Sequence, residues 1–246
     1  PDKKWPASTY NIEVNMRVET EKKMQRWWEN RWILDQIIQA NGLDWDQART
    51  AKIIRNCGPG AVMDLKEITR KVQKFTDIPR EFHRAAQHRE ELAKKTDQEG
   101  HRVNARLHYY FACIYYVYAV WVIFEDGNPK RTAWQEKIRA CYDAYIRLAD
   151  HPIERVELPV EGKSAAALLH LPPGTKPGER LPCVISVQGM DAVKEETRKE
   201  KEKFIYGSNQ VVDIRAKYAA IYSFGVPKRL NWKTGEVSVI EKETPE

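Results

Sequence analysis

Cysteine is scarce in this sequence, with four residues in 246, at positions 57, 113, 141 and 183. No two of them form a CxxC pair, and no histidine stands at the spacing of a zinc ligand set. A zinc centre and a dithiol redox motif are therefore excluded, and we expect neither a metal nor a cofactor. No secretory signal pattern opens the chain, so the expected location is the cytoplasm, with reduced thiols.

The sequence also has no block of basic residues and no apolar run long enough to cross a membrane. The 41 Lys plus Arg alternate with 35 Asp plus Glu, so we expect no nucleic-acid-binding face. The longest uncharged run, residues 109–124, has sixteen residues, five of them tyrosine. That is shorter than the ~20 residues a bilayer requires. It predicts a helix buried on all sides by other helices.

The first 150 residues show the apolar periodicity of helices. Apolar residues recur every three or four positions, and the stop signals are Asn41-Gly42 and Gly58-Pro59-Gly60. Asp44 is the expected cap of the second helix. The predicted helices cover residues 20–40, 44–57, 65–75, 79–92, 109–124 and 129–150.

After His151-Pro152 the apolar period changes from 3.6 to 2, which places a domain boundary near residue 151. We expect a hairpin over residues 153–171, buried strands at 183–187 and 217–224, and a hairpin around Thr234-Gly235. The charged residues 191–204 predict an exposed helix, and the pairs Glu90-Glu91 and Glu195-Glu196 are interpreted as exposed helix charge. The prediction is an α/β protein in which a helical domain, 1–150, precedes a domain at 151–246.

Residues 181–196, LPCVISVQGMDAVKEE, carry the most chemical information. A buried strand that ends in a glycine turn leaves backbone N–H groups open at its carboxyl edge, where they can hold an oxyanion. The alternative is that Gly189 only allows the chain to turn.

The same stretch resembles the α/β-hydrolases with an N-terminal helical lid, typified by 2,6-dihydroxypseudooxynicotine hydrolase and its esterase-like relatives. The similarity lies in Gln188-Gly189-Met190-Asp191, in Lys194-Glu195-Glu196, in the aromatic helix that begins Arg106–Cys113, and in the hairpin over residues 153–171. It implies an α/β-hydrolase-like partial sheet behind an all-α helical lid.

The resemblance also implies an activity: cleavage of an ester, or of a C–C bond next to a carbonyl, by acyl transfer to serine. Gly189 and Met190 would supply oxyanion amides, and His108, Tyr109 and Tyr110 would face a small carbonyl or ester substrate. For these three residues a core or interface role is the open alternative. We expect a homodimer formed through the helical region.

One part of the family pattern is missing, because the sequence contains no G-x-S-x-G nucleophile elbow. Ser208 and Ser223 lack the flanking glycines, and all six histidines precede the oxyanion-like loop, whereas the family's catalytic histidine comes last. The sequence stops before the elbow, so the nucleophile, acid and base are unassigned and little activity is expected of this chain alone. The alternative is a non-catalytic helical interaction module or a truncated product.

Overall fold

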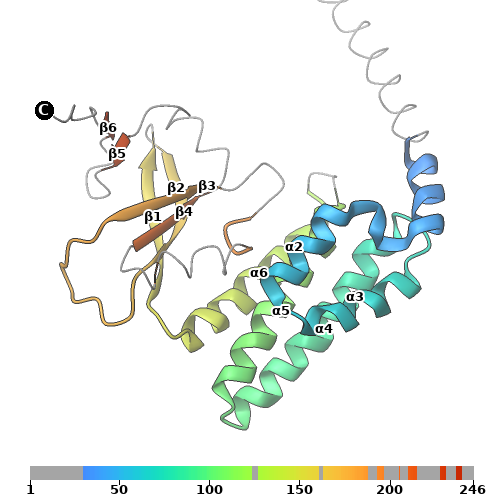
Figure 1. The fold of residues 1–246 in the computed structure, drawn as a ribbon, viewed down its shortest axis with the longest axis horizontal. Helices are drawn as coiled ribbons and strands as arrows, with labels where there is room; N and C mark the ends of the chain where they lie inside the picture. Colours follow the sequence, from blue (N-terminus) through green and yellow to red (C-terminus); the bar gives the residue numbers. More distant parts are fainter. Residues whose placement is uncertain are drawn as a thin grey trace, which may run out of the picture.

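The computed structural model describes residues 30–123, 127–160, 163–187, 193–196, 205, 210–214, 228–230 and 237–239. A group of helices, ending at Leu148, is followed by strands that begin at Ile153 (Figure 1). Within the described ranges, none of the helices combines the length and apolar character that a membrane crossing demands.

The predicted helices are present with small shifts in their ends. They are a helix over residues 30–41, η1 (Gly42–Asp46), α2 (Gln47–Cys57), α3 (Gly60–Lys71), α4 (Asp77–Gln98), α5 (Arg102–Trp121) and α6 (Pro129–Leu148). Residues 20–29 of the first predicted helix lie outside the described residues.

The predicted stop and the predicted cap around residue 42 have different outcomes. Gly42 has φ +61°, and a Cβ there would lie 2.5 Å from Thr69 Cγ2, so glycine is required at this turn. The cap prediction was wrong by two residues, because Asp46 accepts from Arg49 N at 3.2 Å. Asp44 lies inside the 3₁₀ turn η1, which the sequence pattern did not reveal.

Helix α5 is the centre of the helical group, as the uncharged run predicted, and α4 and α6 pack against it. Its tyrosines are buried, and their hydroxyls have acceptors. Tyr115 donates to Asp64 Oδ2 of α3 at 2.7 Å, and Tyr116 donates to Glu90 Oε2 of α4 at 2.7 Å. An aromatic but not fully apolar helix is thereby accommodated in a dry core.

The interpretation of Glu90 as exposed helix charge was wrong. Its exposed fraction is 7%, and it lies between Lys94 Nζ at 2.5 Å and Lys137 Nζ at 2.9 Å. Burial raises the pKa of Glu90, but the hydrogen bonds from Lys94, Tyr116 and Lys137 outweigh it and lower that pKa to about 2.

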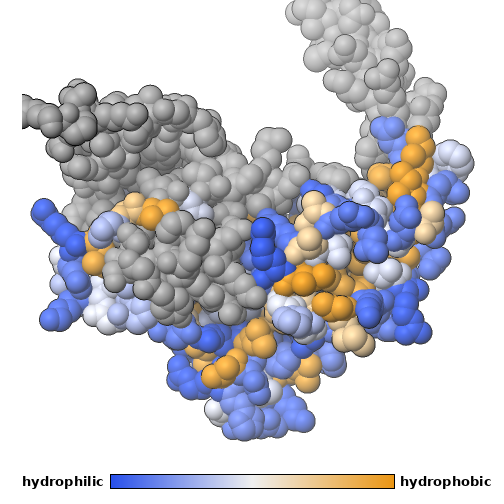
Figure 2. Space-filling view, in the orientation of Figure 1, coloured by the Kyte–Doolittle hydropathy of each residue, from blue (hydrophilic) through white to orange (hydrophobic). Residues whose placement is uncertain are grey.

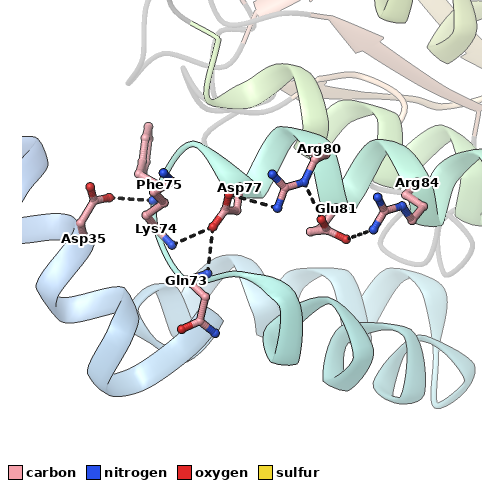
Figure 3. A network of polar contacts seen from close by, with 8 residues as sticks. All are labelled: Asp35, Gln73, Lys74, Phe75, Asp77, Arg80, Glu81 and Arg84. Carbon is pink, nitrogen blue, oxygen red and sulfur yellow. Dashed lines mark hydrogen bonds and ion pairs between the residues drawn. The ribbon is translucent and has the colours of Figure 1, made fainter.

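A polar network fixes the helix over residues 30–41 against the start of α4 (Figure 3). Asp35 Oδ1 accepts from Phe75 N at 2.7 Å, and Asp77 Oδ2 accepts from the backbone N of Gln73 and Lys74 at 3.1 and 3.2 Å. These contacts satisfy the backbone between α3 and α4 and set which face of the 30–41 helix points inward.

The strands form a mixed sheet and a short separate pair. The predicted hairpin is β1 (Ile153–Val160) with β2 (Lys163–His170), which pair antiparallel, and the predicted strand at 183–187 is β3 (Cys183–Val187). The sheet order is β1-β2-β4-β3, where β4 (Gln210–Ile214) is parallel to β3 and antiparallel to β2.

The predictions beyond β3 are met in part. The sequence did not predict β4, and the predicted strand 217–224 lies outside the described residues. On either side of the predicted turn, β5 (Lys228–Leu230) and β6 (Val237–Val239) pair antiparallel, as expected for a hairpin. The helical group followed by this sheet is consistent with a partial α/β-hydrolase fold.

Replacing Glu90 by glutamine tests the buried carboxylate. Because the pKa falls from an ordinary 4.5 to about 2 on folding, the ionised group stabilises the folded chain above pH ~4.5, and this is lost as pH falls through about 2. We expect Glu90→Gln to cost about 2 kcal/mol at pH 7 in urea denaturation, and the cost to shrink toward pH 2. Exposed Glu91→Gln is the control, and a pH-independent cost would contradict the assignment.

Candidate functional site

The structure buries the charged residues that follow β3. Val193, Lys194, Glu195 and Glu196, hereafter the acidic turn, form a turn in which Glu196 N donates to Val193 O at 3.1 Å. Glu195 and Glu196 are only 6% and 3% exposed, so their interpretation as exposed helix charge was wrong. The rest of the predicted helix 191–204 lies outside the described residues.

Glu196 binds the acidic turn to the helical group. Its Oε2 accepts from Lys52 Nζ of α2 at 3.0 Å and from Val193 N at 2.9 Å. Its backbone oxygen accepts from the Tyr110 hydroxyl of α5 at 3.0 Å. One residue is therefore held by two helices and by its own turn.

Glu195 faces the first strand instead. Arg155 of β1 lies 3.8 Å from Glu195 Oε1, donates to Asp143 Oδ1 of α6 at 2.7 Å, and stands 5.9 Å above the Tyr142 ring. Lys194 Nζ lies 3.3 Å from the same Glu195 oxygen. The acidic turn therefore contacts α2 and α5 directly, and it contacts β1 through Arg155, which also pairs with α6.

The electrostatics of this site favour positioning over proton transfer. Burial, followed by the charge and hydrogen bond of Glu196, raises the pKa of Tyr118, and burial raises the pKa of Tyr110. Both phenols therefore stay protonated at neutral pH. Both glutamates have cationic partners, so the arrangement holds the chain in place and does not resemble a general acid paired with a general base.

Gly189 and Met190, the predicted oxyanion residues, lie outside the described residues. The described residues on both sides of them are held by hydrogen bonds. Val187 ends β3 in register with Ile214 of β4, and Val193 begins the acidic turn six residues later.

The three aromatic positions predicted to face the substrate point to different neighbours, because consecutive helical residues diverge by about 100°. His108 Nδ1 accepts from Arg89 at 3.1 Å, and burial, then the Arg89 charge, lowers the pKa of His108. Tyr109 donates to Asp97 at 3.4 Å. Only Tyr110 of the three is shown in contact with the acidic turn.

A second polar cluster that the sequence analysis missed lies where α6 passes into β1. His151 Nδ1 is 3.0 Å from Asp150, and His151 Nε2 is 3.2 Å from His170 Nδ1. Burial raises the pKa of Asp150, but hydrogen bonds from Arg106 and His151 lower it to about 2. The hairpin register could have revealed the pair, since it places His170 opposite Ile153.

A shallow hollow of about 430 Å³ lies beside this cluster, lined by Asp150, His151 and Glu154 among others. No group of three or more metal-ligating side chains occurs in the part of the chain that the structure describes.

Comparison with known proteins gives structural matches only, since no protein-family model and no curated protein matches the chain. The crystal structure of 2,6-dihydroxy-pseudo-oxynicotine hydrolase matches with 23% identity and a TM-score of 0.46, over 54% of this chain and 36% of that one. The structure of AbyA5 matches with 19% identity and a TM-score of 0.41, over 61% and 40%.

The first match is to the enzyme that typifies the family named above, so the resemblance predicted from the sequence is confirmed. The chain spans well under half the length of either matched structure. Both identities are below 25% and both TM-scores below 0.5, so neither match assigns an activity to this chain.

Glu196→Gln tests whether the acidic turn holds the helices and the sheet together. The substitution keeps the side-chain shape but leaves Lys52 without its carboxylate, and we expect a loss of about 2–4 kcal/mol in urea denaturation. The exposed pair Glu67–Lys71, at 2.7 Å on α3, supplies the control, because Glu67→Gln should leave the midpoint nearly unchanged. Equal midpoint shifts in the two variants would count against an anchoring role.

Proposed function

We propose that this chain comes from a serine α/β-hydrolase that cleaves an ester, or a C–C bond next to a carbonyl. The observation that carries the proposal is the anchored acidic turn, which begins six residues after the carboxyl end of β3. In α/β-hydrolases the loop after the third strand supplies an oxyanion N–H.

Anchoring matters because an oxyanion site works when its donors are aimed in advance at the charge that develops in the transition state. Serine attack on a carbonyl makes a tetrahedral oxyanion, which collapses to an acyl-enzyme as the leaving group departs, and water then releases the acid. Val187 is held by β4, and Glu196 is held by Lys52 and Tyr110. Residues held at both ends in this way would lose little entropy on presenting their amides.

These contacts support a proposed role for each part of the chain. Residues 1–150 form the lid and dimerisation region, and residues 151–246 form the first part of the catalytic sheet. Tyr110 supports the oxyanion loop from the lid side by its bond to Glu196. The proposed partners are a small carbonyl or ester substrate and a second copy of the chain, in a cytoplasmic setting.

A non-catalytic helical interaction module is the second candidate, favoured by the absence of G-x-S-x-G from the sequence. The coding DNA beyond codon 246 separates the two. A continuation that encodes G-x-S-x-G, followed by Asp and then His, supports the hydrolase. A stop in an undamaged gene supports the interaction module.

An assay of p-nitrophenyl ester hydrolysis by these 246 residues tests whether they lack the catalytic triad. Because the sequence has no nucleophile elbow, we expect a rate no higher than the buffer background. Preparations of Ser223→Ala and Ser208→Ala should behave identically to the unchanged chain. Turnover that disappears in either serine variant would overturn the proposal that the triad lies elsewhere.

Gly189→Val tests the oxyanion loop in the chain as it exists. We expect phenylphosphonate, a tetrahedral anion, to shift the amide NMR signals of Gly189 and Met190 in the unchanged chain. The valine variant should lose this response, because a side chain strains the turn and blocks the approach.

Ala166→Val, at an exposed position of β2, is the matched control and should keep the response. The contrary result is that phenylphosphonate does not shift the two amide signals while Gly189→Val lowers the melting temperature. Gly189 would then be required only for the turn of the backbone, and Gly189 and Met190 would no longer be assigned to the proposed site.

A further inference from the structure

A hollow of about 630 Å³ lies where the helix over residues 30–41 passes into η1. Its volume is within the range of small-molecule sites. Its lining comes from both of these elements and from the start of α2, and consists of Ile37, Ala40, Asn41, Asp44, Trp45 and Gln47. Figure 2 shows apolar surface over the helix of residues 30–41, at the upper right of the molecule, with hydrophilic residues beside it. None of the lining residues belongs to the proposed oxyanion site, so the hollow is a separate candidate for a ligand.

Contacts with the helical core hold the aromatic wall of the hollow in place. The Thr50 hydroxyl donates to Leu43 O at 3.3 Å and so ties α2 to η1. Trp45 stacks on Trp121 with ring centroids 6.4 Å apart, and its ring meets that of Phe75 edge-on at 6.3 Å. A ligand would therefore meet a wall that is already ordered, which lowers the entropy cost of binding.

Asp44 is the only charged residue among those that line the hollow. Its side chain is exposed, and within the described part of the chain it has no ion-pair partner. The neighbouring Asp46 differs, because its carboxylate caps α2 and pairs with Arg49 Nη1 at 2.5 Å. The hollow therefore carries one uncompensated negative charge.

The helix ends around the hollow favour the same sign of ligand charge. The helix over residues 30–41 ends at Asn41, so the negative end of its dipole lies at the hollow. The positive end of the α2 dipole, at Gln47, is compensated by the Asp46 carboxylate, which accepts from Arg49 N at 3.2 Å. A cation is thus favoured in the hollow and an anion is disfavoured.

The uncharged lining residues indicate the rest of the ligand. Ile37, Ala40 and the half-buried Trp45 form an apolar and aromatic wall that suits a hydrocarbon chain or ring. The side-chain oxygens of Asn41 and Gln47 can accept hydrogen bonds. A primary ammonium group has three N–H donors and no acceptor, which matches one carboxylate and two amide oxygens.

We propose that this hollow binds a small organic molecule that carries a primary ammonium group on an apolar body. The ammonium group lies at Asp44, and the body lies against Trp45 and Ile37. A bare metal ion is a poor occupant, because a single carboxylate among the lining residues supplies too few ligands. The proposal stands apart from the hydrolase assignment, since it uses no residue of the acidic turn or of the oxyanion loop.

Three probes that share a phenylethyl group test the preference for positive charge. Phenethylammonium, the neutral 2-phenylethanol and the anion 3-phenylpropanoate are each titrated while the NMR signal of the Trp45 indole N–H is followed. We expect phenethylammonium to bind with a Kd on the order of 1 mM, at least about fivefold more tightly than the alcohol, and the anion to bind most weakly. Equal binding of the three probes, or no saturable shift with phenethylammonium, would overturn the proposal.

Asp44→Asn separates the effect of the carboxylate from that of the apolar wall. The variant should bind phenethylammonium at least about fivefold more weakly and 2-phenylethanol unchanged, because only the charge is lost. Glu91→Gln removes one exposed charge from α4 and should leave both Kd values unchanged. If Glu91→Gln weakens the ammonium probe as much as Asp44→Asn does, the attraction is to the net charge of the protein and the proposal is wrong.

Ala40→Leu tests the location of the site by filling the hollow. Leucine suits a helix, so the melting temperature should not change, whereas the Kd of phenethylammonium should rise at least about tenfold. Ala48→Leu, at an exposed position of α2 outside the lining, is the matched control and should keep the original Kd. Undiminished binding to Ala40→Leu would show that the probe lies elsewhere.

Nα-acetyl-lysine methylamide, titrated in the same way, distinguishes a small amine from the lysine side chain of another protein. Its flexible butyl chain covers less of the aromatic wall than a phenyl ring does, so we expect it to bind more weakly than phenethylammonium. Tighter binding of the lysine compound would contradict the assignment of a small molecule to the hollow.

Discussion

Each tyrosine hydroxyl on α5 must find an acceptor at the edge of a dry helical core, and this requirement organises the molecule. Tyr115 finds its acceptor in α3, Tyr116 in α4, and Tyr110 in the acidic turn after β3. An unpaired buried hydroxyl would cost about 1–3 kcal/mol, so each of these elements is tied to the same helix. The sheet is connected to the helical core partly through one of these bonds.

The buried and half-buried carboxylates follow from the same requirement. Asp64 accepts from both Tyr115 and Arg89, Glu90 accepts from Tyr116 and two lysines, and Glu196 accepts from Lys52. A buried carboxylate is tolerated when hydrogen-bond donors replace its hydration, and it destabilises the fold when one donor is removed. The stability of the helical group therefore depends on charged pairs that link successive layers.

For function, the consequence is that the described residues on both sides of Gly189 and Met190 are held in place. Val187 belongs to the parallel pair β3 and β4, and Val193 belongs to a turn held by α2 and α5. Helices in the first half of the chain thus hold the acidic turn, which is far from them in sequence. In the proposed hydrolase this anchoring would support the oxyanion amides that follow β3.

The sequence by itself determined the elements whose signals are local. Apolar periodicity located the helices, alternation located the β1 and β2 hairpin, and a short apolar run located β3. Glycine and proline marked the ends of the helices because backbone conformation there is decided within a few residues. The uncharged run at 109–124 likewise identified α5 as the centre of the helical group.

Only the tertiary structure decided which charges are buried. Glu90 and Glu196 look like ordinary helix-surface residues, and nothing local distinguishes them from Glu91 or Glu67. Glu196 is buried because Lys52, 144 positions away, and Tyr110, 86 positions away, supply its partners. Burial of a charge depends on donors brought together by the fold, so local periodicity, which fixes only which residues share a face, cannot predict it.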